Sequence, residues 1–339
     1  MTRIPFAQLY ETIRKALIKA GMDPETAGIC AQAHSQSSCD GIPSHGLNRI
    51  PLFIDYVVKG WVDPKAVPTL VKSMGVIEQY NGNIGPGVTN AIFAVKRGME
   101  LAREYGMGLV ALANTTHWMR GGTYGRMAAE QGFASVSWTN TEPTIPVWGA
   151  KSSVVGNNPI VLAVPRQEGP LVLDMAMTLY SWGKLAVTRL ANESLPYPGG
   201  YDRNGQLTCD PAAIEATRRA LPIGYWKGSG MAVLLDLLSA MLSGGKPGYA
   251  MNAAQDGSCT GCCQIFMIFD PEHFSGKAHA EELANMMVDY LQAAEPAEGV
   301  SAIRYPGESV LRIRAENMEL GIPVDEGAWK ALLKLAGEL

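Results

Sequence analysis

Several features are absent from this 339-residue chain, and each absence removes a class of protein. The longest apolar run, Met231 to Leu242, is shorter than the ~20 residues that a membrane span needs, and it contains Asp236. The net charge is −4, and there is no basic block interleaved with aromatic residues. Met1 to Pro5 leads into a charged amphipathic stretch rather than a secretory signal. We therefore expect a cytoplasmic protein that binds neither a membrane nor nucleic acid.

Cysteine is scarce, with six residues in the whole chain. That number makes no disulfide framework in a protein of this length, and it fits a reducing cytoplasm. Cys259, Cys262 and Cys263 form a C-x-x-C-C motif, but no second C-x-x-C or H-x-x-x-H pair completes the four ligands of a structural zinc site. We expect no metal, and we expect buried, inert thiols because Cys262 and Cys263 open an apolar run.

The standard phosphate-binding motifs are also absent. Neither G-x-x-x-x-G-K-[ST] nor a complete G-x-G-x-x-G is present; Gly85-Pro86-Gly87 and Gly228-Ser229-Gly230 both lack the third glycine. The second fragment follows Trp226 and Lys227 just before a predicted helix, where main-chain N–H groups and a lysine favour a phosphate. A glycine-rich helix start with a solvated lysine is the alternative.

What is present describes an ordinary globular protein, with 47% hydrophobic and 18% charged residues and a length typical of about two domains. Apolar periodicity predicts helices and strands that alternate from about residue 89. The expected helices are 6–20, one from Pro24, 44–60, 91–105, 123–131, 180–191, 229–242, 281–293 and 325–335. The expected strands are 71–79, 108–113, 134–139, 160–164, 171–175 and 262–269. This order indicates an α/β fold with a helical N-terminal region.

Ser44, His45, Gly46 and Arg49 form an S-H-G-x-x-R cluster. We interpret it as the first turn of a helix with Ser44 as N-cap, because the residues that follow have helical apolar spacing. His45 and Arg49 then lie on one face, with Cβ atoms ~6 Å apart, at the positive end of the helix dipole. A titratable ring beside a fixed cation suits an anionic substrate that exchanges a proton. The alternative is a capped helix whose polar side chains face water.

Two more polar groups follow predicted strands, where α/β proteins carry their sites. The run from Asn114 to Gly122 contains His117 and ends in paired glycines, which suggests that a ligand approaches the main chain; a surface loop is the alternative. Asp174 ends an apolar run and suits either ribose hydroxyls or a helix N-cap. The other histidines, which are His34, His273 and His279, are expected to be structural.

Together these segments resemble the type 2 malate/L-lactate dehydrogenases, which are nicotinamide-dependent oxidoreductases with a fold unrelated to the Rossmann dehydrogenases. The resemblance covers nearly the whole chain. It depends on Ser44-His45-Gly46-x-x-Arg49-x-Pro51, Asn114-x-x-His117, Trp148-Gly149, Gly156-x-Asn158-Pro159 and Asp174-Met175-Ala176. Within the family, the runs 108–112, 117–122, 138–140 and 224–231 resemble members that reduce 2,3-diketo-L-gulonate.

The resemblance implies a non-Rossmann mixed sheet and two regions. Residues 1–68 would form a helical region that packs with 305–339, and residues 69–304 would form the α/β cofactor-binding and catalytic region.

The resemblance also implies site residues. His45 matches the proton donor of the diketogulonate reductases, His117 the acid/base residue of the ureidoglycolate dehydrogenases, and Arg49 a ligand of the substrate carboxylate. The implied cofactor contacts are Asn140, Pro170, Leu171, Val172, Leu173, Asp174, Met175, Ala176, Trp226, Lys227, Pro306, Gly307 and Glu308. The stretch from Cys259 to Cys263 departs from relatives, in which this region near the substrate is usually free of cysteine.

These implications predict hydride transfer between NAD or NADP, with NADH favoured, and a small 2-oxo or 2-hydroxy acid, in a homodimer and without a metal. The expected reaction is the reduction of 2,3-diketo-L-gulonate. The alternatives are another acid, such as lactate, malate, ureidoglycolate or piperideine-2-carboxylate, or a non-catalytic carboxylate-binding protein.

Overall fold

The computed structural model describes residues 2–251 and 259–339. Seven of the described strands form one sheet in the order β2-β3-β4-β10-β5-β6-β7, in which β3 and β4 run parallel and all other neighbours run antiparallel. They are β2 (Thr69–Met74), β3 (Ile77–Asn81), β4 (Met107–Thr115), β5 (Ala134–Thr139), β6 (Ile160–Val164), β7 (Leu171–Met175) and β10 (Cys262–Phe269). A Rossmann sheet is mostly parallel, so the expected non-Rossmann mixed sheet is confirmed.

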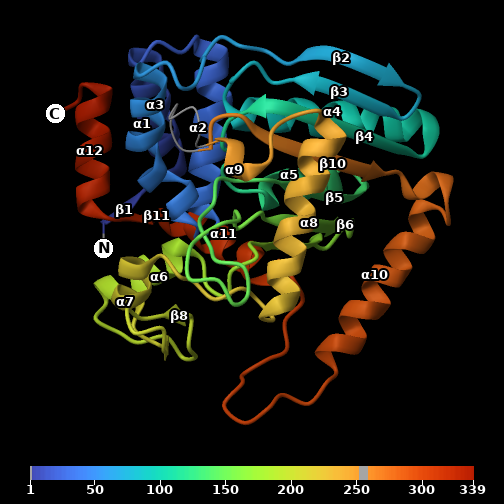
Figure 1. The fold of residues 1–339 in the computed structure, drawn as a ribbon. Coiled ribbons are helices and arrows are strands. Elements are labelled where there is room, and N and C mark those ends of the chain that lie inside the picture. Colours follow the sequence, from blue (N-terminus) through green and yellow to red (C-terminus); the bar gives the residue numbers. More distant parts are fainter. Residues whose placement is uncertain (1, 252–258) are drawn as a thin grey trace.

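Helices cover both faces of this sheet (Figure 1). α4 (Gly87–Tyr105) and α5 (Gly122–Ala129) pack on one face, where Val110 and Phe266 belong to the core. α8 (Trp226–Ser243) packs on the other face against Ala111 and Ile265. Neighbouring residues of β4 and β10 thus point into different cores, as the alternation of a strand requires.

A helical layer beside the sheet contains both ends of the chain (Figure 1). It consists of α1 (Phe6–Lys19), α2 (Pro24–Cys39), α3 (Ile50–Val58) and α12 (Glu326–Ala336), with β1 (Thr2–Ile4) antiparallel to β11 (Ile322–Val324). The start of α2 is as predicted: the Asp23 carboxylate accepts from the main-chain N–H groups of Glu25 and Thr26, and Pro24 takes the first helical position. Ile4, Leu17 and Leu332 share one core, so the two ends stabilise the same layer.

The expected single strand over 71–79 is wrong. The segment is a hairpin in which β2 and β3 pair antiparallel around a turn at Gly75, whose φ is +57°. Glycine adopts this left-handed conformation without strain, so it reverses the chain inside what looks like one apolar stretch.

The expected helix start at Ser44 is also wrong. Pro43–His45 and Leu47–Arg49 form two 3-10 turns, and α3 begins only at Ile50. Gly46 interrupts the turn, and the Leu47 N–H donates to Ser38 Oγ (2.9 Å) rather than continuing a helix. Helical periodicity and a helix dipole therefore do not place His45 beside Arg49; tertiary contacts do.

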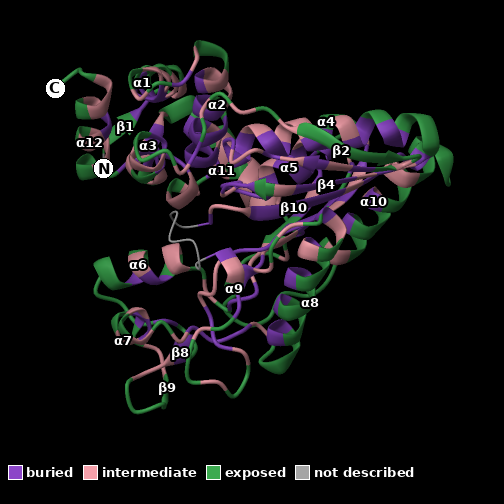
Figure 2. Ribbon diagram, turned by 45° about the horizontal axis from the view of Figure 1, so that its top comes forward, coloured by how far each residue is buried: buried purple, intermediate pink, exposed green. Residues whose placement is uncertain are grey.

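The remaining elements lie outside the large sheet. They are α6 (Trp182–Leu190), β8 (Gly200–Tyr201), β9 (Leu207–Thr208), α7 (Pro211–Thr217), α9 (Gly248–Met251), a 3-10 turn Pro271–His273, α10 (Lys277–Gln292) and α11 (Glu308–Leu320). Among the described helices, none is both long and apolar enough to cross a membrane. Figure 2 shows that α8 and α10 carry exposed residues along their outer faces.

Candidate active site

A cavity of about 680 Å³ lies where the two 3-10 turns of the helical layer meet the sheet. Its wall brings together His45, Arg49 and His117. The expected cofactor contacts that line it are Val172, Leu173, Asp174, Ala176, Pro306 and Gly307. The expected contacts that do not line it are Asn140, Pro170, Leu171, Met175, Trp226, Lys227 and Glu308.

The rings of His45 and His117 stack in this cavity, with centroids 5.8 Å apart and planes inclined by 26°. Burial, together with the charges of Arg49 and Arg120, lowers the pKa of His45 to about 4. Burial also lowers the pKa of His117 well below its usual value, again with Arg49 contributing. Both imidazoles are therefore neutral at neutral pH, beside a permanent cation.

Their hydrogen-bond partners differ in kind. The Met119 N–H donates to Nδ1 of His117 (2.9 Å), so the proton of the neutral ring lies on Nε2. Nδ1 of His45 instead bonds to the Ser44 hydroxyl (3.1 Å), which can accept or donate. The His117 tautomer is thus fixed, whereas His45 can gain a proton on Nδ1 without losing its partner.

A buried ion cluster supports the wall, and no sequence pattern marked it. The Asp40 carboxylate binds Arg120, from the loop after β4, and Arg314 of α11 (2.7 Å). Burial alone would raise the pKa of Asp40, but the two guanidinium groups hold it below its usual range. Residues 40, 120 and 314 meet only through the tertiary fold, so no local spacing could reveal their contact.

The paired glycines Gly121 and Gly122 allow close packing, and Gly121 also lines the cavity, so the approach of a ligand to this segment stays a prediction. A Cβ on Gly122 would lie 2.8 Å from the Asp174 carboxylate, and one on Gly121 would lie 2.7 Å from Val161. Because neither glycine has a side chain, α5 can approach β6 and β7 closely. The Gly122 N–H donates to Asp174 (2.8 Å), and burial raises the pKa of this carboxyl group.

Asn140 is fully buried behind the cavity wall. Its amide donates to Asp236 of α8 (2.9 Å), and its oxygen accepts from the Cys263 N–H (2.8 Å). These bonds fasten α8 to β10 and occupy the side chain.

Trp226 and Lys227 begin α8 and are exposed. The Ser229 hydroxyl beside them accepts from the Trp148 N–H (2.9 Å). Phosphate binding at this helix start stays a prediction.

Two of the three clustered cysteines lie in β10 and cannot converge. Cys262 and Cys263 are neighbours on this strand and point to opposite faces. Burial contributes to raising the pKa of both thiols: in Cys262 it adds to a hydrogen bond with Cys259, whereas in Cys263 it is the largest cause. Cys259 lines the cavity, so the cysteines that distinguish this chain from its relatives begin at the cavity wall.

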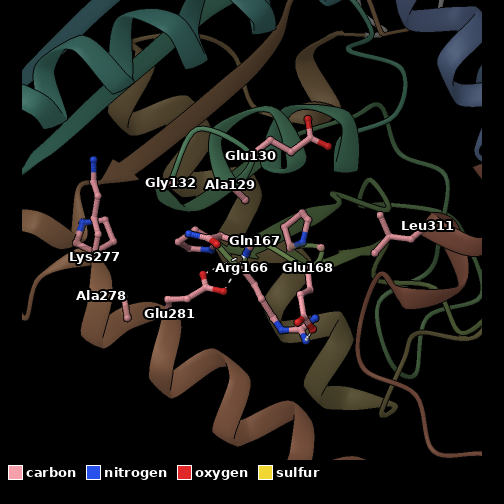
Figure 3. A pocket seen from close by; sticks show the side chains of 15 residues that line it. Ala129, Glu130, Gly132, Arg166, Gln167, Glu168, Lys277, Ala278, Glu281 and Leu311 are labelled. Atoms are coloured by element: carbon pink, nitrogen blue, oxygen red, sulfur yellow. Dashed lines mark hydrogen bonds and ion pairs between the residues drawn. The ribbon is translucent and has the colours of Figure 1, made fainter.

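A second cavity, of about 980 Å³, lies between α10 and the loop that joins β6 to β7 (Figure 3). Its charged side chains already have partners: Arg166 pairs with Glu168 (2.6 Å), and Glu281 accepts from the Gln167 N–H (3.0 Å). Of the expected site residues only Pro170 lines it, so the first cavity is the candidate active site.

The geometry and the family comparison agree. The family model for malate/L-lactate dehydrogenase matches residues 4–333. The chain belongs to this family. It is therefore an oxidoreductase that acts on CH–OH groups, within a family of nicotinamide-dependent dehydrogenases.

Curated and solved members of the family resemble the chain over their full length. The 2,3-diketo-L-gulonate reductase of Shigella boydii is 40% identical over 334 residues, which cover 98% of this chain and 100% of that protein. The sulfolactate dehydrogenase of Methanocaldococcus jannaschii has 28% identity and a TM-score of 0.91, covering 99% of this chain and 97% of that one. The Δ1-piperideine-2-carboxylate reductase of Pseudomonas syringae has 27% identity and a TM-score of 0.85, covering 99% and 100%.

The residues of this family member fit a nicotinamide dinucleotide. Gly307 (φ +95°) packs on β7, where a Cβ would lie 3.1 Å from the Val172 nitrogen, and it leaves the cavity wall open. The next residue, Glu308, has a buried carboxylate oxygen with no hydrogen-bond partner among the described residues. This oxygen and the Asp174 carboxylate are acceptors that suit ribose hydroxyls.

Proposed function

We propose that the protein reduces 2,3-diketo-L-gulonate with NADH. The observation that carries this proposal is the meeting of two neutral imidazoles and Arg49 in one cavity with β7 and Gly307. The relative of that name, which is 40% identical over its full length, supports the choice of substrate.

The cavity also suits a hydroxylated substrate. Thr144 lines it, and its hydroxyl is buried with no hydrogen-bond partner among the described residues. Asn157 and Glu142 line it as well. Buried polar groups gain from a ligand that supplies matching hydroxyls, and a sugar acid does so where pyruvate does not.

Arg49 binds the substrate carboxylate through its planar fork and so orients the neighbouring carbonyl group. His117 donates its fixed Nε2–H to the carbonyl oxygen and polarises it. When bound, the nicotinamide supplies the hydride to the carbonyl carbon.

His45 is the proton donor in this scheme. A bound carboxylate offsets the charge of Arg49 and raises the pKa of His45, and Ser44 Oγ then accepts the new Nδ1–H. The His45 Nε2–H passes to the oxygen as the alcohol forms. His117 is unsuited to this step, because a proton on its Nδ1 would break the bond from Met119.

The two carboxylates beside the cavity favour NADH over NADPH. Asp174 lines the cavity, Glu308 follows the lining residue Gly307, and both would repel a 2′-phosphate but accept from a 2′-hydroxyl. We expect kcat/KM for NADH to exceed that for NADPH by at least ~10-fold, about 1.4 kcal/mol of discrimination. Equal values would contradict this choice.

We also propose a cytoplasmic homodimer that forms through α8. Most large apolar side chains of this helix are exposed, and among them Leu234, Leu237 and Met241 are 58%, 56% and 67% exposed. A contiguous apolar face of this kind is typical of a subunit interface.

The test is a set of initial rates for the reduction of 2,3-diketo-L-gulonate, pyruvate, oxaloacetate and Δ1-piperideine-2-carboxylate. We expect the highest kcat/KM for the diketo acid. His45→Gln should lower kcat by ~10²-fold or more, which a non-catalytic binding protein could not show. A higher kcat/KM for another acid would overturn the substrate, and full turnover by His45→Gln would overturn the proton donor.

A further inference from the structure

His34 lies in α2, outside the cavity, and its side chain is fully buried. Its Nδ1 lies 3.1 Å from the main-chain carbonyl oxygen of His45. A carbonyl oxygen only accepts, so Nδ1 carries a proton and donates to it. This histidine therefore holds the main chain of the residue whose ring faces the substrate.

The other ring nitrogen of His34, Nε2, destabilises the folded state. Burial lowers the pKa of His34 to about 4, so the neutral ring has its proton on Nδ1 and a bare lone pair on Nε2. Nε2 is buried with no hydrogen-bond partner among the described residues. A buried polar atom without a partner destabilises the folded state, so stability alone does not account for a histidine here.

Neighbouring contacts also hold the main chain of residues 45–47 against α2. Ser38, one turn further along α2, accepts from the Leu47 N–H (2.9 Å). Between the two bonds, Gly46 lies so close to α2 that a Cβ would be 2.8 Å from the carbonyl oxygen of His34. Residues 45–47 thus pack directly on α2. Of the two hydrogen bonds that hold them there, the one from His34 is nearer to the His45 ring.

We propose that His34 is a positioning residue for the reduction: its Nδ1–H fixes the main-chain carbonyl of His45 and, through it, the place of the His45 ring beside His117. This inference rests on the proposed role of His45. It gives a role to a side chain whose position on a helix indicates only a structural one.

The test compares three variants of the full chain. The amide nitrogen of asparagine stands three bonds from Cα, as Nδ1 does, whereas that of glutamine stands four bonds away, as Nε2 does. His34→Asn should keep kcat within about 3-fold of wild type. His34→Gln and His34→Phe should lower kcat by ~10- to 100-fold at unchanged Kd for NADH, because a displaced proton donor slows chemistry without weakening cofactor binding.

A second readout does not depend on activity. With ¹⁵N-labelled histidine, the ring resonances of His45 should match wild type in His34→Asn and shift in the other two variants. His273→Asn is the matched control, because its Nε2 also meets a main-chain carbonyl, that of Arg103 (2.9 Å), on the exposed surface. It should change neither kcat nor the His45 resonances.

Equal behaviour of the asparagine and glutamine variants, whether both active, both inactive or both unfolded, would overturn the inference. If wild-type protein reduced no 2-oxo acid, the proposed function would fail, and the His45 resonances would still decide whether His34 positions that ring.

Discussion

At the scale of single residues, the site depends on which partner each imidazole meets. Met119 offers His117 a donor, whereas Ser44 offers His45 a group that can donate or accept. One ring is thereby held in a single tautomer and the other is left free to take up a proton. The two histidines, although stacked and both buried, are not interchangeable.

Binding of a carboxylate should therefore be coupled to proton uptake by His45. Its pKa of about 4 in the free protein rises when a negative charge offsets Arg49, so the complex holds more protons than the free protein between pH 4 and 6.5. Calorimetric titration with oxamate in buffers of different ionisation enthalpy measures this uptake. His45→Gln should abolish the uptake and His117→Gln should retain it; uptake by His45→Gln would assign it to another group.

Arg49→Lys should keep the charge and lose the fork that binds a carboxylate through two parallel bonds. We expect KM for the 2-oxo acid to rise ~10-fold or more, with the Kd for NADH unchanged. Arg312→Lys is a suitable control, because Arg312 is a surface residue 3.9 Å from Glu316. Steady-state rates in both variants are the measurement, and an unchanged KM in Arg49→Lys would remove the carboxylate role.

At the scale of elements, α8 is inverted relative to an ordinary amphipathic helix. Its buried residues are mostly small or polar: Gly228, Ser229, Ala232, Leu235, Asp236, Ser239 and Ser243. Its long apolar side chains other than Leu235 mostly face outward. Asp236, which interrupts the apolar run in the sequence, faces inward and accepts from Asn140 and the Gly248 N–H (2.8 Å).

Leu237→Glu should therefore separate the proposed dimer, because a charge on the apolar face of α8 would be buried without a partner in the interface. Sedimentation velocity at micromolar concentration should change from a dimer to a monomer of 36.4 kDa. Leu190→Glu is the control, since Leu190 is 72% exposed on α6, and it should remain dimeric. A Leu237→Glu protein that stays dimeric would place the interface elsewhere.

The elements also show how far sequence patterns reach. β5, β6, β7 and β10 have the bounds that the sequence predicts, because each is a short apolar run between turn residues. The start of α3 and the β2–β3 turn could not be predicted, since Ser38 and Gly75 decide them against the local pattern. β1 and β11 form only because the two chain ends meet.

The candidate site also contains residues that sequence motifs could predict and residues that they could not. Polar motifs singled out His45, Arg49 and His117, and the fold brings these three into one cavity. Asp40 acts through contacts with segments distant in sequence, and His34 acts through a single bond to a main-chain carbonyl group. No spacing rule predicts either contact.

At the scale of the whole molecule, the cavity lies at the seam between two layers. The helical layer supplies residues 45 and 49, and the sheet with the segments that follow β4 and β7 supplies residues 117, 172–174 and 176. Three histidines with lowered pKa values, His34, His45 and His117, lie near this seam beside Arg49. Acidification must therefore place positive charge on these histidines. We expect the contact between the two layers to weaken as they take up protons.

The unfolded chain takes up protons on His34 and His45 near pH 6.5, whereas the folded chain takes them up only near pH 4. The stabilisation from the neutral rings is thus complete above pH 6.5 and is lost as the pH falls towards 4. For His34, which is fully buried, the loss between pH 7.5 and 4.5 is about 2 to 3 kcal/mol. Urea unfolding of wild type and His34→Asn at both pH values and one protein concentration measures it.

We expect the decrease in unfolding free energy on acidification to be smaller in His34→Asn by about 2 to 3 kcal/mol, because asparagine takes up no proton in either state. His279→Asn provides the comparison, since His279 is exposed and pairs only with Glu282 at the surface (3.3 Å) among the described residues. That variant should lose as much stability as wild type between the two pH values. If His34→Asn lost as much too, the His34 ring would already be charged in the folded protein, and the bare Nε2 lone pair would not exist.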